Sequence, residues 1–455
     1  MNWNAHHRSA QGPARAVGLA VTAALLLVGC GTSADGGSPS DGGTAKVTGK
    51  VAGAITVWTW DGAPGTEAMK KLAAAFEKKT GVKVNSKVVS RDDYKQQAQL
   101  ALNAGDGIDV LGVQPGQFAA EVQPKLLPVS AYQSRLAKGL DGYRPATVAQ
   151  IRKLYKGGGI YSVPFGSTGS SVCFYNAKLL DEAGVQPPQT WKDVRKLTDA
   201  LHAKHPGTLT LVKPSGKDTW FEDEFVLTMA GQQDPGFFNS VRYDGKPWNS
   251  AAYVSALKRY GQLYKDGTLQ RSGLDMGYTD AMNAFDTGKA AMVCNGSWEA
   301  ALLKKEYRKA NDISVPSVGV IPVPADDPAK RSLRSFLDIT WGVPKSAKNP
   351  AAAAAFISFA TQEKAGVDLW AGDLGFVPSA AGWKLDESVL GDDKLASQGY
   401  ATIVDLINHA GSDRNNMSSF SDVVGGYVLE VARGRMTAQQ AADKGQKDLD
   451  SGLYN

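Results

Sequence analysis

Residues 55–113 have the sequence ITVWTWDGAPGTEAMKKLAAAFEKKTGVKVNSKVVSRDDYKQQAQLALNAGDGIDVLGV. Runs of β-forming residues alternate here with segments whose apolar residues recur at helical spacing: 55–60, 69–76, 82–89, 94–104 and 109–113. Strand, helix, strand, helix, strand within about 60 residues is typical of a parallel α/β sheet. Ligands of such sheets bind beyond the carboxyl ends of the strands, so the pattern predicts a binding edge near Trp60.

A second α/β block begins near Tyr161 and continues toward the C-terminus. Thr190 stands three residues before Asp193, and Thr437 stands three residues before Gln440. Both pairs have the spacing of a capping box and predict the start of a helix. A chain of 455 residues is also long enough for more than one core, so we expect an α/β fold in two lobes.

The N-terminal segment predicts the compartment. Residues 1–29 resemble a secretory signal, because two arginines precede an apolar run that is shorter than the roughly 20 residues that a bilayer core needs. The run ends at Leu27-Val28-Gly29-Cys30, which is similar to a bacterial lipobox, where the signal is cut before a cysteine that carries lipid. We expect lipidated Cys30 and a flexible tether, 30–50, to anchor the protein on the extracellular face of the cell membrane. The alternative is a plain secreted protein with an incidental cysteine.

Charge and histidine content exclude several classes of function. The chain has 50 Lys and Arg against 45 Asp and Glu, a net charge of +5. A nucleic-acid-binding protein normally presents a dense basic patch, so we expect no nucleic acid partner. Only five histidines are present, which leaves few candidates for a His-rich metal site or a Ser-His-Asp triad. We expect neither a metal nor a cofactor.

Aromatic residues give the first positive indication of function. The chain has ten tryptophans, more than the usual share. The aromatic residues that gather at predicted strand ends and turns are Trp58, Trp60, Phe165, Trp220, Trp298, Trp341, Trp370 and Phe376. The C–H faces of a sugar stack on aromatic rings while its hydroxyls bond to carboxylates and amides. A single tryptophan is usually a residue of the hydrophobic core. Trp60, Trp220 and Trp298, however, have polar or glycine neighbours in the sequence, which favours a sugar-binding site.

Several segments, in their order and spacing, resemble the family 1 extracellular solute-binding proteins of ABC importers, the maltose-binding-like group. The similar segments are ITVWTWD (55–61), GDGIDV (105–110), YSVPFG (161–166), AGV through PQTW (183–191), GKAAM through NGSW (288–298) and WGVPK (341–345). The resemblance covers essentially everything after the tether.

The resemblance implies a type II periplasmic-binding-protein fold, an α/β fold of two lobes joined by hinge-crossing strands. Lobe 1 would comprise residues 51–164 and 320–341, and lobe 2 residues 165–319 and 342–455. The family member would bind a carbohydrate between the lobes, close on it and deliver it to the transmembrane subunits of an ABC permease. It would act as a monomer and catalyse no reaction.

Carried over position by position, the resemblance also implies the ligand-binding residues. These are Trp60, Asp61, Gln114, Gln117, Phe165, Trp220, Glu222, Asn295, Trp298, Glu299, Trp341 and Phe376. Trp298 is the principal candidate for a stacking platform, and Asp61 and Glu222 would accept hydrogen bonds from sugar hydroxyls.

Alternatives remain open for the cysteines and the ligand. Cys173 and Cys294 lie in two predicted strands and are either bridged or two buried thiols, since an exported protein permits disulfides. The same fold could bind a polyamine or a phosphodiester. A secreted glycoside hydrolase is the rival from another class, because a pair of catalytic carboxylates has no sequence signature.

Overall fold

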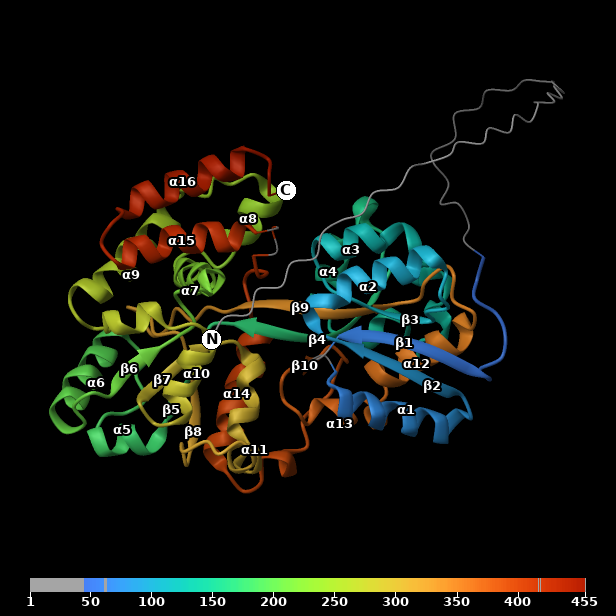
Figure 1. Ribbon diagram of the computed structural model, residues 1–455, viewed down its shortest axis with the longest axis horizontal. Coiled ribbons are helices and arrows are strands. Elements are labelled where there is room, and N and C mark those ends of the chain that lie inside the picture. The colour runs from blue at the N-terminus through green and yellow to red at the C-terminus, as the bar shows by residue number, and fades with distance from the viewer. Residues whose placement is uncertain (1–44, 61–63, 416, 418, 455) are drawn as a thin grey trace, which may run out of the picture. The chain divides into compact units, whose positions relative to one another are not determined.

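The computed structural model describes residues 45–60, 64–415, 417 and 419–454 (Figure 1). Cys30, Asp61 and the predicted signal 1–29 lie outside the described residues. The strands are β1 Ala54–Trp60, β2 Lys83–Val89, β3 Val110–Val113, β4 Val163–Ser170, β5 Val172–Asn176, β6 Leu209–Val212, β7 Ala290–Asn295, β8 Val318–Pro322, β9 Arg334–Gly342 and β10 Val377–Pro378. The helices are α1 Thr66–Thr80, α2 Arg91–Ala104, α3 Gln117–Val122, α4 Pro145–Leu154, α5 Ala177–Ala183, α6 Trp191–Lys204, α7 Thr219–Gly231, α8 Phe237–Asp244, α9 Ala251–Lys265, α10 Tyr278–Asp286, α11 Lys305–Ala310, α12 Pro350–Gln362, α13 Lys364–Ala371, α14 Lys394–Asn408, α15 Phe420–Ala432 and α16 Ala438–Asp450.

The first sheet has the strand order β10-β4-β9-β3-β1-β2. β1 pairs in parallel with β2 and β3, as the sequence predicts, while β9 runs antiparallel between β3 and β4. Met69, Leu72 and Phe76 form the buried face of α1, and that helix ends at Gly81, whose φ of 75° suits a residue without a side chain. All four residues of β3 are buried, as expected for a strand covered on both faces.

The second sheet has the order β6-β7-β5-β8. Cys173 of β5 lies opposite Cys294 of β7, and the two residues form a disulfide. The bridge joins positions that are 121 residues apart in the sequence. Both cysteines are fully buried, so the disulfide lies in the core of this sheet.

Two chain segments connect the sheets. β4 pairs with β9 up to Ser170, and β5 pairs with β8 from Val172 onward, so the chain changes sheet at the single residue between them. That residue, Ser171, has a φ of 67°, in the left-handed region that L-residues rarely adopt. The second connection is the segment between β8 and β9. The predicted α/β fold, with strands crossing between two lobes, is confirmed.

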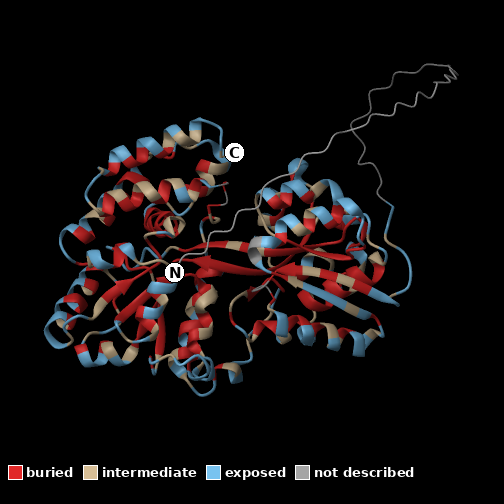
Figure 2. Cartoon of the chain, in the orientation of Figure 1, coloured by how far each residue is buried: buried red, intermediate tan, exposed pale blue. Residues whose placement is uncertain are grey.

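Buried residues lie along the strands of both sheets (Figure 2). Their side chains form one cluster around the first sheet, the first core, and two clusters around the second sheet, together called the second core. We expected residues 342–455 in the second lobe, but α12 and α13 pack in the first core. The reason is aromatic packing: Phe356 stacks on Trp341 with ring centroids 5.6 Å apart, and Phe359 contacts Phe76. Conversely, residues 320–322 belong to β8 and so to the second sheet, although we expected them in lobe 1. These two segments therefore pack with the other sheet than the one expected for them.

The predicted tether also ends earlier than expected. The backbone N–H of Val47 donates to the carbonyl of Ala131 at 2.8 Å, and the side chains of Val47 and Val51 pack against the first core. The folded part thus begins before residue 50, because these apolar side chains have a core to join. None of the helices formed by the described residues has the length and apolar character needed to cross a membrane.

Candidate functional site

Two neighbouring cavities lie where segments of both cores meet. The aromatic cavity, about 710 Å³, is lined by rings from both cores: Trp60, Trp220, Tyr278, Trp298, Phe336 and Phe376. The amide cavity, about 380 Å³, is lined by carboxamide side chains: Gln114, Gln117, Gln150 and Asn415. The cavities share a wall of Phe336, Asp338, Arg414 and Ser419. Among the residues expected to bind ligand, the aromatic cavity includes Trp60, Trp220, Trp298 and Phe376, and the amide cavity includes Gln114 and Gln117.

Trp298 is held in a fixed orientation in the aromatic cavity. It comes shortly after the end of β7, and its ring lies so close to Gly296 that a Cβ there would come within 2.1 Å of the indole. The indole Nε1 donates to Tyr278 Oη at 2.8 Å, and Tyr278 in turn donates to Glu299. Burial raises the pKa of Glu299 and that of Tyr278. Glu299 thus orients the tryptophan through Tyr278 instead of lining the cavity as expected.

Arg414 covers part of the aromatic wall. Its guanidinium carbon lies 4.8 Å from the ring centroid of Trp220 and 4.9 Å from that of Phe336, within the range of cation–π contacts. Its Nε lies 3.7 Å from a carboxylate oxygen of Glu224. One side of Trp220 is therefore occupied by a cation, so this ring is less available for stacking than the sequence suggests.

Asp338 is the acceptor that the sequence analysis missed. It lies on β9 two residues after Phe336, on the same side of the strand, and it lines both cavities. No hydrogen bond or ion pair joins its carboxylate to another described residue. The only sequence signal was a carboxylate in a strand that is otherwise largely apolar. A half-exposed, unpartnered carboxylate between two cavities can accept hydrogen bonds from a ligand.

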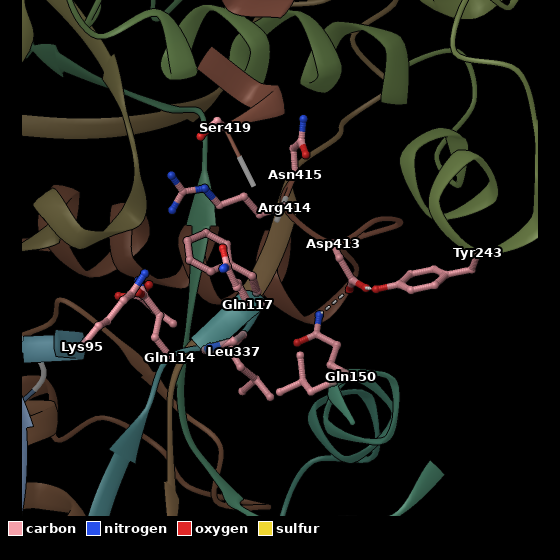
Figure 3. Close-up of a pocket in the computed structure, with 15 residues that line it drawn as sticks. Lys95, Gln114, Gln117, Gln150, Tyr243, Leu337, Asp413, Arg414, Asn415 and Ser419 are labelled. Carbon is pink, nitrogen blue, oxygen red and sulfur yellow. Dashed lines mark hydrogen bonds between the residues drawn. The ribbon is translucent and has the colours of Figure 1, made fainter. Parts of the chain in front are cut away.

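The amide cavity has a polar floor. Figure 3 shows Gln150 and Tyr243 meeting at Asp413, while Arg414 extends away from this group. Gln150 Nε2 donates to Asp413 at 2.9 Å, and Tyr243 Oη donates at 3.4 Å. Burial raises the pKa of Asp413. The carboxamides of Gln114 and Gln117 provide donors and acceptors of the kind that bind hydroxyl groups.

Two expected aromatic ligands belong to the first core instead. Phe165 and Trp341 are fully buried and line neither cavity. Phe165 stacks on Trp370 with ring centroids 4.0 Å apart, and Trp341 stacks on Phe356. Both side chains face the α12–α13 side of the sheet, away from the two cavities.

Glu222 is also a core residue. Its carboxylate is fully buried, where Lys213 Nζ donates to it at 2.6 Å and Ser215 and Tyr260 donate as well. Burial lowers the pKa of Lys213, and the neighbouring Glu222 opposes that shift. Donors of the protein thus surround the carboxylate of Glu222, which lines neither cavity.

Asn295 shapes the turn before Trp298. It is fully buried, its Oδ1 accepts from the N–H of Gly296 at 2.9 Å, and its Nδ2 faces Met282. The amide therefore fixes the chain direction at the end of β7 and lines neither cavity. Within the described residues, no group of three or more His, Cys, Asp or Glu side chains could hold a metal ion.

Comparison with known proteins gives a family and several relatives. The model of the family "bacterial extracellular solute-binding protein" matches residues 62–367. The multiple sugar-binding protein of Streptococcus mutans is 24% identical over 249 residues, which span 53% of this chain and 56% of that protein. The arabinooligosaccharide-binding protein of Bacillus subtilis is 24% identical over 363 residues, 78% of this chain and 77% of that protein. The chain thus spans only about half the length of the first of these relatives.

Solved structures show the same fold. The GacH receptor of Streptomyces glaucescens, solved unliganded and with acarbose, has a TM-score of 0.66 at 20% identity. That match covers 89% of this chain and 100% of the receptor. Maltose-bound MalE3 of T. maritima has a TM-score of 0.65 at 19% identity, covering 88% of this chain and 100% of MalE3. The two-lobe α/β architecture is common to all three chains.

Proposed function

Because the chain belongs to the bacterial extracellular solute-binding protein family, we propose that it captures a carbohydrate and delivers it to the permease of an ABC importer. The ligand is a mono- or oligosaccharide held in the aromatic and amide cavities. The relatives from Streptococcus mutans and Bacillus subtilis are named for binding sugars, which supports this class of ligand. The protein works as a monomer and catalyses no reaction.

The observation that best supports a sugar is the carboxylate of Asp338, which no described residue bonds, beside the rings of the aromatic cavity. A pyranose has apolar C–H faces and a rim of hydroxyls, so it needs both aromatic surface and strong acceptors. Trp298 and Phe376 provide the surface, and Asp338 with Gln114 provides polar partners. A phosphodiester would be repelled by Asp338, which makes that ligand the weaker candidate.

We further propose that the protein is anchored through lipid on Cys30 at the extracellular face of the cell membrane. The lipobox-like LVGC at residues 27–30 supports this anchor. Replacing Cys30 by Ser should release the protein from the membrane fraction into the medium. Equal membrane retention of the variant would refute the anchor and leave the sugar proposal intact.

A ligand screen on residues 45–455 tests the function. Arabinotriose, galactotriose, maltotriose, spermidine and glycerophosphodiesters are added while the unfolding temperature is recorded. At 100 times its dissociation constant, a ligand should add about 2.7 kcal/mol of stability. Stabilisation only by spermidine or a phosphodiester would replace the sugar with that ligand. Release of shorter sugars during incubation would indicate a glycoside hydrolase.

Replacing Trp298 by Ala tests the stacking platform. Loss of a largely buried aromatic contact removes about 2 kcal/mol of binding free energy, so the dissociation constant should rise about 30-fold in calorimetric titration. Trp298→Phe should retain most of the affinity, because a ring remains. Trp383→Ala is the matched control, since Trp383 lies outside both cavities. Unchanged affinity of Trp298→Ala would disprove the platform.

A further inference from the structure

Helix α7 has three consecutive carboxylates that are fully buried: Glu222, Asp223 and Glu224. Lys213 neutralises the first of them, and Arg334 of β9 forms an ion pair with the third. Asp223 has no ion pair with any described residue, although it lies between the two that do. Its Oδ2 accepts hydrogen bonds from Asn415 Nδ2 at 2.8 Å and from Ser421 Oγ at 2.9 Å.

The two donors belong to the segment that walls both cavities. Arg414, Asn415, Ser419 and Ser421, which come from residues 412–422, all line one cavity or both. The start of the segment is tied to its surroundings, since Ser412 pairs with Arg334 of β9. Further along, the hydrogen bonds to Asp223 hold Asn415, which precedes α15, and Ser421 in the first turn of that helix. The position of Arg414 and Ser419 in the shared wall therefore depends on contacts at both ends.

We propose that Asp223 is a positioning residue for sugar binding: its ionised carboxylate holds Asn415 and Ser421, so sugar affinity falls as pH is lowered through neutrality. The inference rests on the proposed function and adds regulation to the same site. Asp223 itself lines neither cavity and acts only through the segment 412–422.

The groups around Asp223 make its charge sensitive to pH near neutrality. Burial, and then the charge of Glu224, raise the pKa of Asp223 to about 7, while Arg334, Asn415 and Ser421 oppose the rise. Arg414 lies 3.7 Å from the carboxylate of Glu224, and Tyr253 of α9 interacts electrostatically with Asp223. Burial raises the pKa of Tyr253 well above its ordinary value, so this phenol stays neutral. With its pKa raised to about 7, Asp223 gains charge as pH is increased from 5.5 to 8.5.

Loss of that charge weakens both hydrogen bonds. A carboxylate is roughly twice as strong an acceptor as a neutral group. Protonated Asp223 therefore restrains Asn415 and Ser421 less, and the ligand has to order the segment when it binds. We expect a three- to tenfold rise in dissociation constant from pH 8.5 to pH 5.5.

The first experiment is a calorimetric titration of arabinotriose, galactotriose and maltotriose at pH 5.5, 7.0 and 8.5. The wild type should show the three- to tenfold change, and Asp223→Asn should bind with the weaker affinity at every pH. Asp286→Asn is the matched control, because burial raises the pKa of Asp286 to about 6 and this residue lines neither cavity. A flat wild-type profile would overturn the proposal, as would the full pH dependence in Asp223→Asn.

The second experiment needs no ligand. Hydrogen exchange of peptides from 412–422 is measured in the free protein at pH 5.5 and 8.5 and corrected for intrinsic rates. The wild type should exchange faster at pH 5.5, whereas Asp223→Asn should exchange fast at both. If Asp223→Asn does not fold, Ser421→Ala, which removes one donor, should show a smaller pH difference. Equal exchange at both pH values in the wild type contradicts the inference even if no sugar binds.

Discussion

At the scale of single residues, Asp338 is the side chain on which the sugar proposal depends most. A hydrogen bond to a charged group contributes about 1.5–3 kcal/mol, against about 1 kcal/mol between neutral groups. Asp338→Asn should therefore weaken sugar binding about tenfold, and Asp338→Ala should weaken it further. The measurement is calorimetry with a sugar found in the screen. Asp392→Asn, an exposed position away from both cavities, serves as control. Equal affinity of Asp338→Asn and the wild type would remove Asp338 from the site.

The buried pair of Lys213 and Glu222 should determine stability and not ligand contact. Removing one partner of a buried ion pair leaves an uncompensated charge and destabilises by about 3–5 kcal/mol. Lys213→Met and Glu222→Gln should each lower the free energy of unfolding, as measured in urea. The double replacement should lose less than the sum of the two, because no charge remains unpaired. Additive losses would show that the two groups do not neutralise each other.

Residues of the candidate site could be predicted only where their neighbours in the sequence differ from the neighbours of a typical core residue. Trp298 follows a glycine at the end of a strand, and its place in the aromatic cavity agrees with that context. Phe165 and Trp341 stand in equally suggestive segments, yet they are buried. Arg414 has no local signal, because its place beside Trp220 results from contacts between residues that are far apart in the sequence.

At the scale of elements, helices α7 and α15 can pack closely only because position 425 is a glycine. A Cβ at Gly425 of α15 would lie 1.8 Å from the carbonyl oxygen of Thr219 of α7. Gly425→Ala should force the helices apart and destabilise the protein by about 1–3 kcal/mol or more. It should also weaken sugar binding, because Ser421 of α15 donates to the carbonyl of Trp220 of α7 and both residues line the aromatic cavity. Gly426 has no atom within 4 Å of its Cβ position.

Gly426→Ala is therefore the matched control for Gly425→Ala. It adds a methyl group in open space within the same helix, so it should stabilise by about 0.5–1 kcal/mol. Thermal unfolding of both variants measures the difference. Similar stability of the two would mean that α7 and α15 separate easily.

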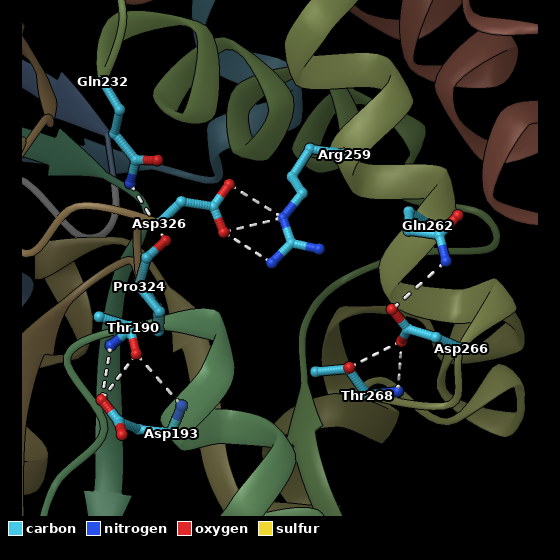
Figure 4. A network of polar contacts seen from close by, with 9 residues as sticks. All are labelled: Thr190, Asp193, Gln232, Arg259, Gln262, Asp266, Thr268, Pro324 and Asp326. Carbon is cyan, nitrogen blue, oxygen red and sulfur yellow. Dashed lines mark hydrogen bonds and ion pairs between the residues drawn. The ribbon is translucent and has the colours of Figure 1, made fainter.

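Among the features of the helices, the positions at which α6 and α16 begin were predicted most accurately. Figure 4 shows Thr190 and Asp193 exchanging the hydrogen bonds of the predicted capping box, and Thr437 forms the second box with Gln440. Such pairs are local, so the sequence alone specifies them. The same figure shows Arg259 of α9 bonded to Asp326, a contact between elements for which no local pattern exists.

At the scale of the whole molecule, the parallel strands β1–β3 and the α/β class follow from hydrophobic periodicity. The strands that cross between the lobes were implied by the resemblance to the family, whose characteristic segments occur here in the same order. The lobe boundaries were less accurate, because membership in a core depends on tertiary packing. The Ala-rich helix α12 is apolar on nearly every side, so its sequence does not indicate which sheet it covers.

The last prediction concerns the two cores together. The cavities take Trp60 and Gln114 from the first core and Trp220 and Trp298 from the second, so a ligand that contacts all four binds only when both cores are folded. Helices α1 and α9 line neither cavity, and their buried amides exchange hydrogen only when their core opens. Sugar at 100 times its dissociation constant should therefore slow exchange about 100-fold in both helices, as followed by mass spectrometry. Protection of α1 alone, or of α9 alone, would place the sugar within one lobe and contradict a site shared by both. Trp298→Ala at the same sugar concentration should reduce the protection of both helices equally, because one binding equilibrium stabilises both.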